Sequence, residues 1–184
     1  MHAARIAALA LLLAIAACDR PNGATDAVEG PATSVFSHSM GSDLSGYYMP
    51  MSEVRVGNWS FDHVFVGQTA EFQAWEAGER NGTFGPVMLQ FDDVTSPMVP
   101  TEIGEARSVT VRVLPTAYSV TDTSVSFEGR VPELGVVRFE GVLDPGALAT
   151  SRRNLGNEGV VVTGTLTIGN APPRSVLLRW WGGD

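Results

Sequence analysis

Histidines and neighbouring carboxylates are the side chains of this chain best suited to proton transfer or metal binding. After the first ten residues only His38 and His63 remain, and Asp62 directly precedes His63. Successive side chains of a regular strand point to opposite faces, so we do not expect Asp62 to orient His63. We predict instead that His63 is a hydrogen-bonded member of a half-buried strand face, and that Asp92 and Asp93 form a solvated acidic edge.

Sequence motifs for metal binding or nucleophilic catalysis are missing. The single cysteine excludes a CxxC pair, and the chain contains neither an HxH pair nor a GxSxG turn. The segment SHSMGSD at 37–43 gathers serines around His38, but in a predicted loop. The sequence therefore predicts no catalytic residues, no cofactor and no metal site, and favours a protein that is not an enzyme.

The single cysteine, Cys18, follows directly after an apolar segment. Arg5 and the amino terminus form a short positive start, residues 6–17 are apolar, and the last residues before Cys18 are small. This order is typical of a secretory signal. The apolar run is also shorter than the roughly 20 helical residues that cross a bilayer core. We therefore predict that residues 1–17 are a signal peptide.

The order Ile15, Ala16, Ala17, Cys18 resembles the lipobox of bacterial lipoproteins. The resemblance implies cleavage between Ala17 and Cys18, and a diacylglycerol joined to the Cys18 sulfur by a thioether. It also implies a location in the bacterial cell envelope, with the domain facing the periplasm. Asp19 is similar to the signal that keeps enteric lipoproteins in the inner membrane, but this rule varies between lineages. Attachment to the inner and to the outer membrane therefore both remain open.

Composition limits the partners and the domain organisation of the 184-residue chain. The formal net charge is −8 and all basic side chains are arginines and histidines, so we expect no nucleic-acid partner. Residues 19–33 are small, polar and interrupted by proline and glycine, and they bury too little apolar area to offset the entropy of ordering. We expect residues 18–33 to be a lipidated N-terminus and flexible tether, and residues 34–184 to be a single β domain.

Alternation of apolar and polar residues dominates the chain after Ser34. Between Trp59 and Val66, for example, every second residue is aromatic or histidine. A period of two predicts strands with one apolar face. Eight segments show strand character, at 53–56, 59–66, 87–94, 107–114, 124–128, 136–143, 159–168 and 175–181. Their spacing favours an all-β fold, an antiparallel β-sandwich or β-barrel of about eight strands.

One or two short helices complete the predicted fold. Asp144 and Pro145 form an N-cap and first-turn pair, and Gly156 follows as a stop signal. A second helix is predicted from Thr69 to Ala77, before a glycine. Neither segment is long enough to be stable unless it packs on the sheet.

Aromatic residues near both ends of the domain suggest an interaction surface. Trp180 and Trp181 are consecutive, so in a strand one ring points inward and the other shares a face with Arg179. We expect a neighbouring loop or helix to cover the outward ring. The alternative is that this ring is exposed and marks a contact surface. Tyr47 and Tyr48 are predicted to lie in a loop before the first strand. The candidate surface is Tyr47, Tyr48, Arg179 and Trp181.

The segment VTGTLTIGNAPPRSVLL at 162–178 resembles the closing hairpin of YceI-like periplasmic proteins. This resemblance implies a lipocalin-like barrel that holds a long apolar lipid. It covers only the end of the chain, and we transfer no binding residues from it.

Three functions follow from these patterns. The first is a lipid-anchored envelope protein whose β domain binds or scaffolds envelope proteins without catalysis. The second is a carrier of an apolar ligand inside a YceI-like barrel, in which Val160, Val162, Leu166 and Ile168 would line a void. The third and least favoured is a hydrolase that uses His38 or His63.

Overall fold

The computed structural model describes residues 35–102, 104–156 and 158–183. They belong to one compact unit, Thr33–Asp184. The signal peptide predicted at 1–17, the lipid-bearing Cys18 and the tether predicted at 18–33 lie outside the described residues. In the described part of the chain, neither helix combines the length and the apolar character that a membrane span requires.

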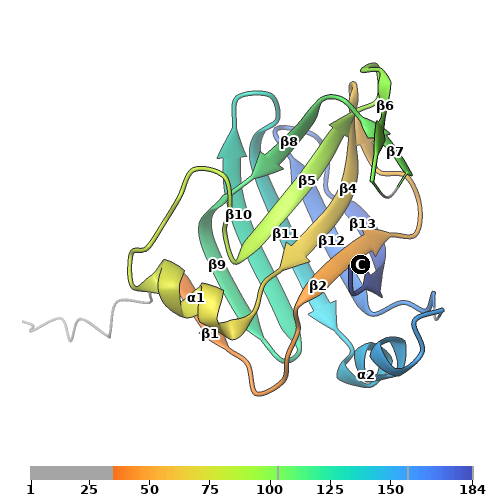
Figure 1. Ribbon diagram of the computed structural model, residues 1–184. Coiled ribbons are helices and arrows are strands. Elements are labelled where there is room, and N and C mark those ends of the chain that lie inside the picture. The colour runs from red at the N-terminus through yellow and green to blue at the C-terminus, as the bar shows by residue number, and fades with distance from the viewer. Residues whose placement is uncertain (1–34, 103, 157, 184) are drawn as a thin grey trace, which may run out of the picture. The chain divides into compact units, whose positions relative to one another are not determined.

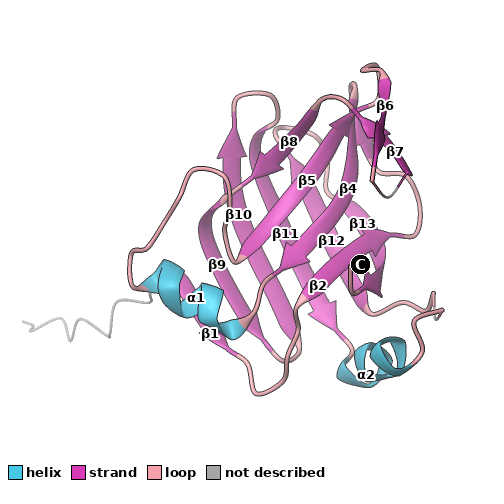
Figure 2. Ribbon diagram, viewed as in Figure 1, coloured by secondary structure: helices cyan, strands magenta, loops and turns pink. Residues whose placement is uncertain are grey.

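Strands make up most of the described residues, and they form one large curled sheet (Figures 1 and 2). In chain order the strands are β1 (Phe36–Ser39), β2 (Gly46–Pro50), β3 (Arg55–Val56), β4 (Trp59–Val66), β5 (Val87–Asp93), β6 (Met98–Thr101), β7 (Gly104–Arg107), β8 (Thr110–Val113), β9 (Pro115–Thr121), β10 (Ser124–Val131), β11 (Gly135–Leu143), β12 (Val162–Ile168) and β13 (Arg174–Trp181).

The large sheet has eleven strands in the order β1-β9-β10-β11-β12-β13-β2-β4-β5-β8, with β3 paired to β4. It curls into a half-barrel, and β6 and β7 form a separate hairpin (Figure 2). Neighbouring strands are antiparallel except that β1 pairs with β9 in parallel. The all-β fold class is confirmed, and of the two expected forms the sheet is the barrel-like one.

Each of the eight predicted strands corresponds to an observed strand, and five further strands, β1, β2, β6, β7 and β9, were not predicted. β1 and β9 are rich in serine and threonine, and β2 is bounded by glycine and proline, so their sequences are typical of loops. Pairing with strands that are distant in the sequence overrides these weak local preferences.

Both predicted helices are confirmed. α1 (Thr69–Glu76) and α2 (Pro145–Arg153) begin where their sequences indicate. The Asp144 carboxylate accepts hydrogen bonds from the backbone N–H groups of Gly146 and Ala147 at 2.8 and 3.0 Å, and so caps α2. α2 ends at Arg153, before the predicted stop at Gly156.

Helix α1 packs beside β1 and β9 (Figure 1) and adds Phe72 and Trp75 to the core. Its Glu76 carboxylate accepts a hydrogen bond from the Tyr118 hydroxyl at 3.0 Å and pairs with His38 Nδ1 at 2.9 Å. His38 is therefore a structural residue that joins β1 to α1, and its predicted loop position is wrong.

The interior of the half-barrel is filled by side chains. Phe139 on β11 is 1% exposed, and its ring lies over Gly141 and over Gly164 on β12, which face each other across the two strands. A Cβ atom on Gly164 would lie 2.9 Å from Phe139 Cε2, so the absence of side chains at the two glycines makes room for the ring.

The apolar residues of β12 belong to the same packed core. Val162, Leu166 and Ile168 are 1–3% exposed and lie in one cluster with the aromatic rings of the opposite strands. Val160 precedes the strand and is 36% exposed. Val162, Leu166 and Ile168 therefore pack against other core side chains, whereas Val160 lies outside the core cluster.

Arg152 on α2 fixes the start of β2. Its guanidinium donates to the Asp43 carboxylate at 2.8 Å and to the Ser45 carbonyl oxygen at 2.8 Å, and it lies over the Trp180 ring at 5.1 Å from the centroid. Trp180 Nε1 donates to the same Ser45 oxygen at 3.0 Å. Two donors thus hold the backbone immediately before Gly46.

We expect the Asp43–Arg152 ion pair to make the free energy of unfolding depend on pH in the acidic range. The hydrogen bond from Arg152 lowers the pKa of Asp43 to about 2 from its ordinary value of 3.8. A lowered native pKa stabilises the fold above about pH 4, and this contribution is lost as the pH falls towards 2. Because Asp43 is largely solvated, we expect a contribution of about 1 kcal/mol or less.

Urea unfolding of wild type and Asp43→Asn at several pH values measures this contribution. The difference in unfolding free energy should be present at pH 6 and should shrink between pH 4 and 2. A difference that stays constant over this range would contradict the role of the ion pair.

Candidate functional site

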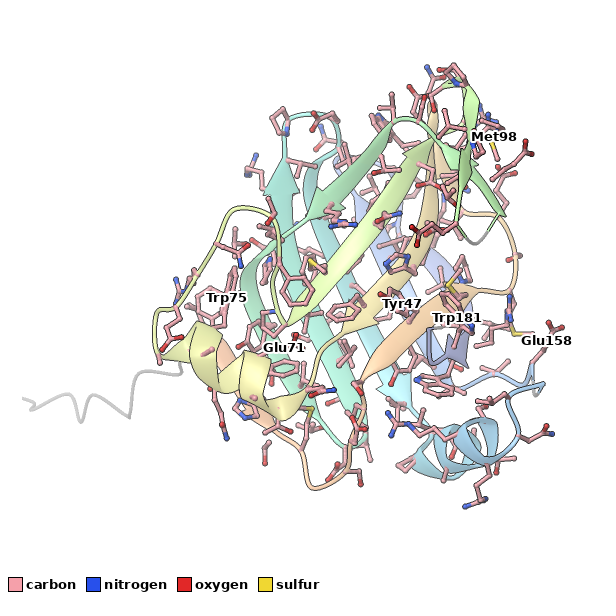
Figure 3. The ribbon with its side chains drawn as sticks, in the orientation of Figure 1. Tyr47, Glu71, Trp75, Met98, Glu158 and Trp181 are labelled. Carbon is pink, nitrogen blue, oxygen red and sulfur yellow. The ribbon has the colours of Figure 1, made fainter. Side chains whose placement is uncertain are left out.

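Solvent-facing rings of β13, β2 and β4 form an aromatic row. Trp181 lies opposite Tyr47, and Tyr47 lies opposite Phe65. The ring centroids are 5.4 Å apart in the first pair and 5.3 Å apart in the second. Phe84 extends the row with its ring 5.3 Å from that of Phe65. Figure 3 shows Tyr47 and Trp181 side by side on the sheet.

A β-bulge in β4 brings Asp62 and His63 together beside this row. The register of β4 against β5 shifts between Phe61 and His63, which leaves Asp62 without a partner in the ladder. His63 Nδ1 lies 2.7 Å from Asp62 Oδ2. The expectation that the two residues do not pair is therefore wrong, because the bulge interrupts the alternation of faces on which it depends.

His63 is confirmed as a hydrogen-bonded member of a half-buried face, since 12% of its side chain is exposed. The hydrogen-bonded chain continues outward from Asp62. Gln90 Nε2 donates to Asp62 Oδ2 at 3.5 Å, and Arg112 Nε donates to Gln90 Oε1 at 3.2 Å. An ionised carboxylate only accepts, so Nδ1 of His63 donates and Nε2 is its remaining hydrogen-bonding atom.

Asp92 on β5 adds a second carboxylate to this face. Its Oδ1 atom is buried and has no hydrogen-bond partner among the described residues. Burial raises the pKa of the Asp92 carboxyl above its ordinary value, and the nearby charge of Asp62 raises it further. The prediction of a solvated acidic edge is therefore wrong for Asp92, which is half-buried.

A pocket of about 460 Å³ opens beside Tyr47, and we call it the Tyr47 pocket. Smaller depressions of about 340 and 90 Å³ also include Tyr47 and Phe65, so Tyr47 lies where three hollows meet. The Tyr47 pocket is lined by two aromatic rings, a thioether, the paired carboxylate and imidazole, and two glycines: Tyr47, Trp181, Met49, Asp62, His63, Gly182 and Gly183.

The chain before Tyr47 positions its ring. Gly46 has a φ of 139°, which favours glycine, and a Cβ atom at this position would collide with Trp180 Nε1. The close approach of Trp180 and Arg152 to the Ser45 carbonyl oxygen therefore sets where β2 begins. With this start, Tyr47 faces solvent and Tyr48 faces the core.

Three of the four predicted surface residues lie on the same outer face. Tyr47 and Trp181 line the pocket, and Arg179 lies opposite Met49 in the next row. The guanidinium of Arg179 is 3.5 Å from the Glu158 carboxylate. Trp181 is 36% exposed, so the expected cover by a loop or helix is not observed.

Tyr48 does not belong to this surface, and its assignment to it is wrong. The side chain is 1% exposed, and its hydroxyl donates to the Leu44 carbonyl oxygen at 2.7 Å. The error follows from the predicted loop, because a loop does not separate neighbouring side chains. In the observed strand β2, alternation sends Tyr47 and Tyr48 to opposite faces.

Sequence reasoning missed Asp62 and His63 as pocket residues. The adjacency of an acid and a histidine in an aromatic strand was the only available signal, and a regular strand would have separated them. Among the residues that the structure describes, no three His, Cys, Asp or Glu side chains gather into a metal-binding group. Apolar walls with a few polar atoms are the usual composition of a site for a small ligand.

Comparison with protein-family models, with curated proteins and with solved structures found no match to this chain.

Proposed function

We propose that this chain is a lipoprotein of the bacterial cell envelope, with a β domain that binds a ligand or partner without catalysis. Cys18 carries the lipid, the domain faces the periplasm, and the Tyr47 pocket is the binding site. The observation that carries the proposal is the exposed pocket, which combines Tyr47 and Trp181 with the Asp62–His63 pair. Aromatic rings supply large contact areas at small entropic cost and are enriched at binding surfaces.

The packed interior supports a site on the outside of the sheet. A carrier of a long lipid needs an internal cavity, whereas Val162, Leu166 and Ile168 pack against core side chains and Phe139 covers the two interior glycines. We therefore place the binding site at the Tyr47 pocket and rank the apolar-ligand carrier second.

The Asp62–His63 pair is the observation that favours a hydrolase as another candidate. A carboxylate that orients an imidazole is a common arrangement for a general base. Within the described residues, however, no serine, threonine or cysteine side chain hydrogen-bonds to His63. The pair therefore lacks a positioned nucleophile, and we favour a role in binding.

Cross-linking in intact cells tests the binding face. Formaldehyde treatment of cells that express the tagged full chain should give discrete adducts, and Trp181→Ala should reduce their yield about tenfold, as expected when a central aromatic contact of about 1.4 kcal/mol or more is removed. Leu177→Ala is the matched control, because Leu177 lies on the same strand and is 47% exposed.

Equal adduct yields from wild type and Trp181→Ala would refute the assignment of the site. Loss of adducts in both variants would place the interface elsewhere along β13. The adduct yields are compared at equal amounts of protein, so the amount of chain in each membrane fraction is measured in parallel.

A further inference from the structure

We infer that the Tyr47 pocket recognises a quaternary ammonium group, such as the trimethylammonium of choline. This inference rests on the proposed function, and it adds the chemical class of the ligand. It is carried by the aromatic walls of the pocket and by the carboxylate that lines it.

The aromatic walls of the pocket meet at different angles. The Tyr47 ring is inclined by 43° to the Trp181 ring and by 81° to the His63 ring, with centroids 5.4 and 5.0 Å apart. Walls at different angles suit a rounded group, and the Met49 thioether adds a polarisable surface to the same pocket.

The charge of the site complements a cation. Asp62 lines the pocket with 31% of its side chain exposed, and Asp92 lies close enough for the two carboxylates to influence each other. The basic side chains nearby are engaged, since Arg179 on β13 is paired with Glu158 and Arg112 on β8 donates to Gln90. The whole chain has a formal net charge of −8, which attracts cations at longer range. Cations over aromatic faces gain further electrostatic attraction.

One of the two carboxylate oxygens of Asp62 is already hydrogen-bonded, which favours a quaternary over a primary ammonium. Asp62 Oδ2 is occupied by His63 Nδ1 and is approached by Gln90 Nε2. A lysine-like ammonium brings three N–H donors that need acceptors. A quaternary ammonium has no N–H donor, so it can use the charge of Asp62 and the ring faces without further acceptors.

The test compares choline with 3,3-dimethylbutan-1-ol, which has the same shape and hydroxyl group but no charge. The full chain in octyl glucoside is titrated with each compound and followed by ligand-observed NMR, which detects weak binding. Choline should bind, and the neutral analogue should bind about tenfold more weakly or not at all. Equal binding of both compounds, or no binding of choline, would overturn the inference.

Two variants connect the binding to the pocket. Asp62→Asn should weaken choline binding severalfold and leave binding of any neutral probe unchanged, because it removes charge and keeps the shape. Trp181→Leu should weaken choline binding about tenfold, whereas Leu177→Ala should not. An unchanged affinity of both Asp62→Asn and Trp181→Leu for choline would also overturn the inference.

A vesicle experiment separates the two sources of this group. The Cys18→Ser chain, which carries no acyl anchor, is floated with vesicles of phosphatidylcholine or of phosphatidylglycerol. Binding of choline together with selective flotation on phosphatidylcholine supports a lipid headgroup as the source, and choline binding without flotation supports a free solute. Failure of choline to bind, while Trp181-dependent adducts persist in cells, would refute this inference and leave the proposed binding face intact.

Discussion

Phe139→Ala is expected to lower the free energy of unfolding by about 3–5 kcal/mol, the usual range for removing a buried phenylalanine. The ring is 1% exposed in the centre of the half-barrel. Its neighbours Gly141 and Gly164 have no side chains that could move into the vacated space. The cavity would therefore remain open, and we expect a cost near the upper end of the range.

A loss of this size is a large part of the roughly 5–15 kcal/mol that stabilises a typical domain. Denaturant unfolding of the full chain in a Cys18→Ser background, followed by circular dichroism, measures the change. Val142→Ala is the matched control, because Val142 is on the same strand and is 68% exposed. Its expected effect is within about 0.5 kcal/mol.

The same experiment tests whether the interior is filled. A cost below about 1.5 kcal/mol for Phe139→Ala would mean that the ring does not fill the space over Gly141 and Gly164 on the inner face of the sheet. The interior would then be a place for a ligand, and the apolar-ligand carrier would become the better proposal. The stability of this one variant thus separates the two leading functions.

Cys18→Ser is expected to move the protein from the membrane fraction to the soluble fraction of the cell. Each CH₂ buried in a bilayer contributes about 0.8 kcal/mol, so two or three acyl chains hold a protein where one chain gives only marginal, reversible binding. Serine cannot form the thioether, so the diacylglycerol would be missing, and the apolar run at 6–17 is too short to span a bilayer. We therefore expect nearly complete release.

Fractionation after a high-salt wash measures this release. Arg20→Ala is the control, because it leaves the lipobox-like segment Ile15–Cys18 intact. Mass spectrometry of the wild-type chain should show the added lipid on an N-terminal Cys18. A Cys18→Ser chain that stays in the washed membranes would show that another attachment holds the protein. An unmodified wild-type thiol would refute the lipid anchor directly.

Several features of the fold could be predicted from the sequence because their causes are local. Alternation of apolar and polar residues within one strand, as in 59–66, is present whatever the partner strand is. The cap of α2 likewise depends only on Asp144 and the next three residues. The eight predicted strands and both helices were therefore found. The outward direction of Trp181 also follows from alternation within its own strand, whereas that of Tyr47 follows only once β2 is known.

The site could not be predicted in the same way, because contacts between segments distant in the sequence bring its residues together. Tyr47 faces Trp181 because β2 pairs with β13, and the two strands are separated by most of the domain sequence. Asp62 meets His63 because pairing with β5 introduces a bulge, and no residue of β4 alone indicates one. Composition, alternation and the apolar N-terminal run were enough to predict a β-rich, acidic chain with a signal-like start. Which side chains share a pocket could be learned only from the folded sheet, because strand pairing and register are set by non-local packing that short-range patterns do not contain.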